Sequence, residues 1–117
     1  MLTEKNRALK IPDASYVDYA IRYFENNYMN EIYISDLSKT LGIESSYFSK
    51  LFKSKTGTAP IEYLTRVRID KAKQLLKFPP YSIKSISKAV GFTDPLYFSK
   101  KFKQYTGINP TDFSKIK

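Results

Sequence analysis

The sequence predicts an all-α fold with seven helices, in which two helix-turn-helix units are joined by one long helix. The first observation behind this prediction is a repeat: "YFSKLFKSKTG" begins at Tyr47, and "YFSKKFKQYTG" begins at Tyr97. The second is that apolar residues recur at helical spacing, while no segment alternates for long enough to be a convincing strand. A chain of 117 residues can form one compact domain, or two small units that share a core.

A first helix is predicted before the repeat, at about residues 14–27, behind the start signal Pro12-Asp13. Its apolar residues follow the i, i+3, i+4, i+7 rule, at Val17, Ala20, Ile21, Phe24 and Tyr28. This stripe would pack one face of the helix on the core.

The repeat itself is longer than the letters quoted above. Residues 34–60 align with residues 83–110 if one residue is added after Phe92. Each copy has a short apolar-periodic segment, a glycine, a few turn residues, a second segment, and then Thr-Gly and a proline. A left-handed glycine commonly ends a helix, a role that suits Gly42, Gly57, Gly91 and Gly107. Each copy is therefore predicted to form two helices around a tight turn.

A long linker helix is predicted between the two copies, beginning at Pro60. Its apolar positions form one stripe, made of Ile61, Leu64, Val67, Ala72, Leu75 and Leu76. Pro79 and Pro80 are expected to end this helix, because a proline removes a backbone donor and clashes with the preceding turn.

Two further helix starts are visible in the second copy. Asp94 followed by Pro95 predicts an N-cap and a first helical residue, and Pro110 can start a last short helix over residues 111–115. The chain then divides into a linker or cut end (1–12), a first helix-turn-helix subdomain (13–59), the linker helix (60–78) and a second subdomain (79–117).

Composition narrows the function classes. Twenty Lys and Arg residues against 11 Asp and Glu give a net charge of +9, which favours a polyanionic partner, either nucleic acid or an acidic membrane surface. Cysteine and histidine are absent, so the usual zinc ligands and His-based acid–base pairs are absent too. No acidic cluster or Gly-rich phosphate loop is present either. We expect a cytoplasmic protein that is not an enzyme, with no metal, cofactor or membrane span.

The second helix of each copy has two contrasting faces on a helical wheel. The inner faces hold Tyr47, Phe48, Leu51 and Phe52 in the first copy and Tyr97, Phe98 and Phe102 in the second. The outer faces hold Ser46, Ser49, Lys50 and Lys53 in the first copy and Leu96, Ser99, Lys100 and Lys103 in the second. Such a helix fits the major groove, about 12 Å wide, where its side chains reach base edges and phosphates.

Each feature also has a plainer interpretation. A Lys/Ser face on a single helix is usually a solvated surface, but its repetition in a basic chain indicates a used surface. The Tyr-Phe pairs at 47–48 and 97–98 are interpreted as core packing rather than as base stacking. Lys101 lies at the edge of its apolar side, where its stem can be covered. Leu96 either packs on a neighbouring turn or meets a thymine methyl group.

The sequence resembles the DNA-binding domain of the arabinose-regulator (AraC) family of bacterial transcription factors, over about residues 16–113. The most specific segment is "VGFTDPLYFSKKFKQYTGINP", which ends at Pro110, supported by "SSYFSKLFKSKTG" and "EYLTRVRIDKAKQLL". The resemblance implies seven helices, with the third and sixth as recognition helices in successive major grooves.

The resemblance also implies base-contacting positions, at Ser46, Ser49 and Lys50 in the first unit and at Pro95, Leu96, Ser99 and Lys100 in the second. Lys53 and Lys103 are the expected phosphate contacts. Many members have Arg at positions 50 and 100, and Lys lacks the planar fork that selects guanine. Arg68, in the family's "R-(hydrophobic)-x-x-A" context, is interpreted as structural, through an internal ion pair or a cap.

Most family members join this domain to a sensing or receiver domain that controls dimerisation. We expect this chain to be the DNA-binding part of a longer regulator, monomeric by itself, because residues 1–11 resemble a domain linker. Double-stranded DNA is the expected partner, with RNA polymerase and dimerisation through a missing domain left open. The alternative is a helical adaptor that binds an acidic protein. A fused DNA-repair methyltransferase would need an acceptor cysteine, which the chain lacks.

Overall fold

The structure is a computed structural model that describes residues 11–78 and 82–116, and within these ranges it consists of helices and contains no strand. The helices in chain order are α2 (Asp13–Asn27), α3 (Ile34–Leu41), α4 (Ser45–Thr56), α5 (Pro60–Leu75), α6 (Ile83–Ala89), α7 (Pro95–Thr106) and α8 (Pro110–Ser114). The predicted all-α fold of seven helices is therefore confirmed for the described residues.

Glycines end the helices where the repeat predicted them. Gly42, Gly57 and Gly107 are the left-handed C-cap residues of α3, α4 and α7, with φ of 76°, 82° and 89°. Gly91 follows the end of α6 with φ of 101°. These values lie in the region that side chains with a Cβ rarely adopt, so the glycines allow each tight turn.

Helix starts also follow the sequence signals. Pro60, Pro95 and Pro110 are the first residues of α5, α7 and α8, where the missing N–H costs nothing. Asp94 caps α7 by accepting a hydrogen bond from the backbone N–H of Leu96 at 3.0 Å. At α8 the side-chain oxygen of Asn109 accepts in the same way from the backbone N–H of Asp112. Both helices thus begin with an Asp or Asn cap one residue before proline.

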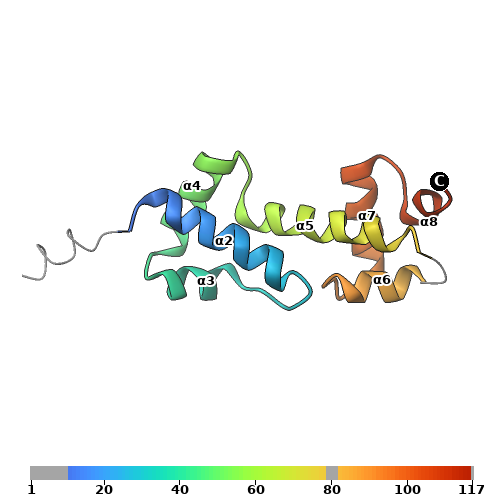
Figure 1. Ribbon diagram of the computed structural model, residues 1–117, viewed down its shortest axis with the longest axis horizontal. Helices are drawn as coiled ribbons and strands as arrows, with labels where there is room; N and C mark the ends of the chain where they lie inside the picture. The colour runs from blue at the N-terminus through green and yellow to red at the C-terminus, as the bar shows by residue number, and fades with distance from the viewer. Residues whose placement is uncertain (1–10, 79–81, 117) are drawn as a thin grey trace, which may run out of the picture.

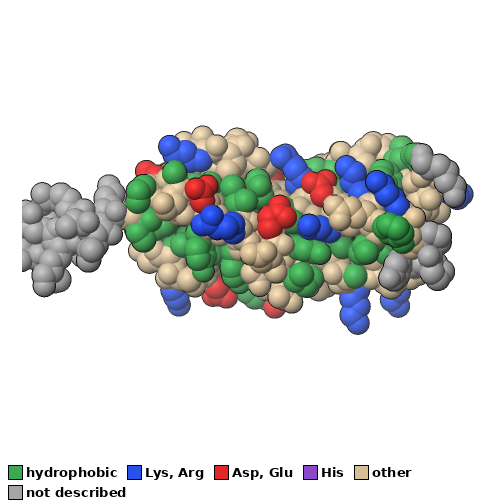
Figure 2. Space-filling view, viewed as in Figure 1, with side chains coloured by type: hydrophobic (Ala, Val, Ile, Leu, Met, Phe, Trp, Pro, Cys, Tyr) green, Lys and Arg blue, Asp and Glu red, His purple; other side chains and the backbone are tan. Residues whose placement is uncertain are grey.

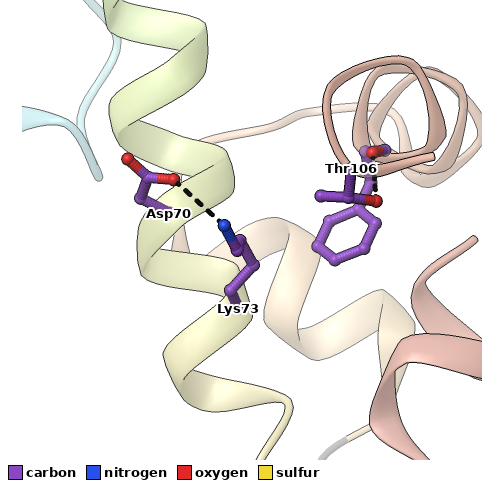
Figure 3. Close-up of polar contacts among 4 residues, drawn as sticks. Asp70, Lys73 and Thr106 are labelled. Carbon is purple, nitrogen blue, oxygen red and sulfur yellow. Dashed lines mark hydrogen bonds and ion pairs between the residues drawn. The ribbon is translucent and has the colours of Figure 1, made fainter. Parts of the chain in front are cut away.

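The repeated threonine of each Thr-Gly pair closes the end of its helix. Thr106, which Figure 3 labels, has its Oγ1 2.8 Å from the carbonyl oxygens of both Phe102 and Ile108, which share its single proton. The same oxygen accepts from the Ile108 backbone N–H at 3.3 Å. Thr56 repeats this arrangement at the end of α4. The motif therefore joins α4 and α7 to the loops that follow them.

Six of the described helices form two groups of three along an elongated molecule, α2 to α4 and α5 to α7. α2, α3 and α4 pack together at one end, α6 and α7 pack at the other, and α5 runs between the two ends (Figure 1). α5 packs on α7 as α2 packs on α4, so the linker helix is also the first helix of the second group. α8 packs on α7.

Two hydrophobic clusters correspond to these groups. The first consists of Val17, Ala20, Phe24, Leu37, Phe48, Leu51, Phe52 and Leu64. The second consists of Ile69, Ala72, Leu76, Ile86, Val90, Phe92, Phe98 and Phe102. Each buried Phe or Leu side chain contributes about 1.5–3 kcal/mol by leaving water. α5 thus serves both cores, with Leu64 in the first and Ile69, a residue outside the predicted stripe, in the second.

Some expectations differ from the structure. Ile61 belongs to the predicted apolar stripe of the linker helix, but its side chain is 52% exposed and lines an open cleft instead of a core. The first helix begins at Asp13 without a side-chain cap, and the last spans Pro110–Ser114. The expected stop at Pro79 and Pro80, and residues 1–10 of the expected linker at 1–12, lie outside the described residues.

Arg68 has the structural role that the sequence suggested, and it acts as a cap. Its Nε and Nη2 atoms donate to the carbonyl oxygens of Tyr28 and Asn30, each at 2.8 Å, just beyond the end of α2. These carbonyls have no partner inside the helix, and a charged donor satisfies them well. Burial lowers the pKa of Arg68 from its ordinary value, although a guanidinium remains charged.

Candidate DNA interface

Buried aromatic side chains fix the rotation of the second helix in each unit. α4 buries Phe48, Leu51 and Phe52, and α7 buries Phe98 and Phe102. Because these residues share one side of each helix, the opposite side faces away from the core. We call these outer surfaces the α4 face, made of Ser46, Ser49, Lys50 and Lys53, and the α7 face, made of Pro95, Leu96, Ser99, Lys100 and Lys103.

The α4 face is open to solvent along its length. Ser46, Lys50 and Lys53 are exposed, and Ser49 is half-buried. Hydroxyl groups both donate and accept hydrogen bonds, and a lysine ammonium donates three. The face therefore offers short groups that reach nearby atoms and long groups that reach anions.

The α7 face has the same pattern with more apolar character. Leu96 is 81% exposed, Lys100 and Lys103 are exposed, and Pro95 and Ser99 are half-buried. Of the two alternatives for Leu96, packing on a neighbouring turn is excluded by this exposure. The structure thus brings the predicted residues of the second unit to one surface of α7.

Tyr47 and Tyr97 are not core residues, contrary to expectation. Their side chains are 47% and 49% exposed, because each lies at the border between the inner and outer sides of its helix. The Tyr47 hydroxyl donates to Asp13 Oδ1 at 3.1 Å, and the Tyr97 ring packs on Phe92 with centroids 6.1 Å apart. Lys101 Nζ lies 5.6 Å from the Tyr97 ring centroid, which agrees with its predicted place at the apolar edge.

The two units differ at the start of their second helices. In the first, the hydroxyl groups of Ser38 and Ser45 are 2.8 Å apart. In the second, Ser87 and Pro95 occupy these positions, and Ser87 Oγ is buried with no hydrogen-bond partner in the described part of the chain. The sequence analysis did not predict this difference in hydrogen bonding, although the aligned copies place Ser45 of the first unit opposite Pro95 of the second.

Lysines on the first helix of each unit extend the basic surface. Lys39 on α3 and Lys84 and Lys88 on α6 are exposed, and Figure 2 shows basic side chains projecting from the edge where α6 lies. Sequence analysis did not single out these residues. Lys39 and Lys88 occupy the same place in the aligned copies, and that correspondence could have indicated them.

Acidic side chains pair with lysines on another part of the molecule. Lys73 Nζ lies 3.7 Å from Asp70 Oδ1 on the exposed side of α5 (Figure 3), and Lys71 Nζ lies 3.8 Å from Glu25 Oε1 between α5 and α2. Figure 2 shows acidic, basic and hydrophobic side chains mixed on the side of the molecule where α2 and α5 lie. In residues 11–78 and 82–116, no lysine of the α4 or α7 face takes part in an ion pair. Those lysines are thus available to an anionic partner.

An open cleft of about 730 Å³ lies between the two units. It is lined by α5, α6, the start of α7 and the loop after α2, with Arg68 and Gly91 among its residues. The described residues include no group of three side chains suited to a metal ion. Within the same ranges, no helix has the length and apolar character to cross a membrane.

Comparison with known proteins finds similarity to this chain in both sequence and fold. A protein family described as "Helix-turn-helix domain" matches residues 37–116. The Msm operon regulatory protein of Streptococcus mutans is 36% identical over 97% of this chain, and the match covers 40% of that protein. This chain therefore spans about two fifths of the length of such curated relatives.

Two solved domains are similar throughout most of their length. The C-terminal domain of the two-component response regulator yesN from Fusobacterium nucleatum is 33% identical, with a TM-score of 0.79 over 84% of this chain and 96% of that one. The C-terminal domain of the response regulator AraT from Geobacillus stearothermophilus is 27% identical, with a TM-score of 0.81 over 86% and 84%. With the family match over residues 37–116, these similarities place the chain in the AraC-type helix-turn-helix family of DNA-binding domains of bacterial transcription regulators.

Proposed function

We propose that this chain binds double-stranded DNA sequence-specifically by placing α4 and α7 in two successive segments of the major groove, and that it regulates transcription in this way. The observation that carries the proposal is the pair of exposed outer faces, which repeat serines and lysines on two units joined by one helix. Membership of a family of DNA-binding domains supports it.

Base contacts in this proposal come from Ser46, Ser49 and Lys50 on the α4 face and from Pro95, Leu96, Ser99 and Lys100 on the α7 face. Hydroxyl groups can bond either kind of base edge, Lys can reach guanine, and the exposed Leu96 side chain can contact a thymine methyl group. Lys53 and Lys103 contact phosphates, which fix the register without reading sequence. Lys39 and Lys88 are further candidates for phosphate contacts.

The proposed division of labour follows the predicted parts of the chain. Residues 13–59 and 79–117 each read one box of DNA, and residues 60–78 connect them. The domain acts as a monomer in the bacterial cytoplasm, without a cofactor and without catalysis. In an intact regulator, other parts would supply dimerisation, and contact with RNA polymerase would supply activation.

Selection of bound sites from a random pool of duplex DNA tests the proposal directly. We expect two boxes of different sequence whose centres are about one helical turn apart, roughly ten base pairs. The boxes should differ because Pro95 and Leu96 replace Ser45 and Ser46 in the second unit. Failure to enrich any sequence, together with binding to an acidic protein surface, would favour a helical adaptor instead.

Insertions between the selected boxes give the second test. About five added base pairs rotate one box by half a turn, so the affinity should fall toward that of a single unit. About ten added base pairs restore the rotation but double the separation. Equal affinity for the sites with no, five and ten added base pairs would mean that only one helix reads DNA.

A further inference from the structure

Arg68 connects the two units of the molecule directly. Its guanidinium donates to the carbonyl oxygens of Tyr28 and Asn30, each at 2.8 Å, in the loop between α2 and α3 of the first unit, which here includes α2. The same group lies 5.9 Å from the centroid of the Phe92 ring, in the turn between α6 and α7 of the second unit. One side chain of the linker helix is therefore in contact with both units.

Gly91 brings that turn close to the same place. A Cβ atom at residue 91 would lie 2.8 Å from Arg68 Nε and would overlap the carbonyl oxygen of Tyr28. Gly42 has the same position in the first copy and also has positive φ, yet a Cβ there would meet nothing within 4 Å. Gly91 thus has a packing role between the units in addition to its left-handed conformation.

Tyr28 completes this contact. Its ring packs against both hydrophobic clusters, and Lys71 Nζ lies 5.5 Å from the ring centroid. Tyr28, Arg68, Gly91 and Phe92 together form what we call the joint. The units are therefore connected through the joint as well as through the backbone of α5.

We propose that the joint fixes the angle between α4 and α7, and that Arg68 is thereby the positioning residue that sets which spacing of two DNA boxes the protein accepts. This inference rests on the proposed two-box function. A planar guanidinium that bonds two carbonyls holds a defined direction, whereas a helix backbone alone can bend and twist.

The physical reason is the geometry of the duplex. One added base pair moves the second box by about 3.4 Å and rotates it by about 35°. A pair of units held by the joint cannot follow this change without losing contacts or deforming the DNA. A pair connected only by α5 can follow it, but loses the advantage of being preorganised.

The experiment compares variants of the full chain on duplexes that carry the selected boxes with one base pair removed, none changed, or one added, and on a duplex with one box scrambled. Arg68→Met removes the donors but keeps a stem over Phe92, and Arg68→Lys keeps the charge but not the fork. Arg66→Met is the matched control, since Arg66 is exposed on the same helix. Gly91→Ala is compared with Gly42→Ala, which shares the backbone strain without the clash.

Wild type, Arg66→Met and Gly42→Ala should lose about tenfold or more in affinity when the spacing changes by one base pair. Arg68→Met and Gly91→Ala should lose less than about threefold in affinity when the spacing changes by one base pair. In these variants the ratio of two-box affinity to one-box affinity should fall about tenfold. Arg68→Lys should lie between them. Binding to the duplex with one intact box should stay within about twofold of wild type.

Two results would overturn the inference. Unchanged spacing selectivity in the Arg68 and Gly91 variants would show that α5 alone orients the units. Parallel loss of one-box and two-box binding would show that the joint only supports folding. If wild type itself gained nothing from the second box, the proposed function would fail instead, so the two failures are distinguishable.

Discussion

The hydroxyl groups of Ser38 and Ser45 lie 2.8 Å apart, joining the two helices of the first helix-turn-helix unit at their turn. The second unit has Ser87 in the place of Ser38 but Pro95 in the place of Ser45, so the corresponding bond is absent. Ser38 and Ser87 are both buried, and only Ser38 has a partner within the described residues.

Removing these two hydroxyl groups should therefore have different effects on the free energy of unfolding. Ser38→Ala should lower the free energy of unfolding by about 0.5–1.5 kcal/mol, because a partnered hydroxyl is lost. Ser87→Ala should leave it unchanged or raise it by about 1 kcal/mol, because an unpaired buried hydroxyl is removed. Urea unfolding of both variants measures the difference, and equal destabilisation would mean that Ser87 has a partner such as water.

The affinity for DNA should depend steeply on salt. If the basic faces neutralise roughly six to eight phosphates, log affinity should fall against log salt with a slope of about −5 to −7. Fluorescence anisotropy with a labelled duplex at several salt concentrations gives this slope. A slope near zero would contradict an interface built on Lys53, Lys103 and their neighbours.

Substitutions on the two faces should separate base contacts from phosphate contacts. Ser49→Ala and Leu96→Ala should change the preference at particular base pairs by about 1–3 kcal/mol, whereas Lys53→Ala should weaken binding to all sequences alike. Competition with a set of single-base-pair variants of the site measures both effects. Uniform weakening by all three substitutions would show that the base-reading positions are wrongly assigned.

Tyr47 should titrate at unusually high pH. The hydrogen bond from its hydroxyl to the Asp13 carboxylate raises the pKa of Tyr47 above its ordinary value. Because the pKa is raised by folding, the bond contributes its stability below about pH 10 and loses it as the pH rises through the pKa of the folded state.

An NMR titration of the tyrosine ring carbons checks this prediction, with Tyr47→Phe identifying the signal. Asp13→Asn should shift the Tyr47 titration to lower pH and leave that of Tyr33 unchanged. Tyr33 is the internal control, since its pKa is raised above its ordinary value by the neighbouring Glu31 carboxylate and not by Asp13. An unchanged Tyr47 titration in Asp13→Asn would mean that the bond does not persist in solution.

Local sequence signals predicted the helices, most of their ends and the two outer faces. Left-handed glycines, Asp94 before Pro95 and the 3.6-residue period act within a few residues of one another, so each can be recognised locally. The repeat added the information that the same unit occurs twice. The rotation of α4 and α7 followed as well, because Phe48, Phe52, Phe98 and Phe102 had to be buried.

The contacts by which the two units meet could not be predicted from these local signals. Arg68 finds its acceptors at Tyr28 and Asn30, and Gly91 approaches the same carbonyl oxygen from the other unit. These contacts join residues far apart in the chain, and no local period or capping signal encodes them. The half-exposed position of Tyr47 had the same cause, because its environment depends on where the start of α2 lies relative to α4. Short-range backbone physics thus fixed the elements, while the packing of α2, α5 and the α6–α7 turn fixed their arrangement.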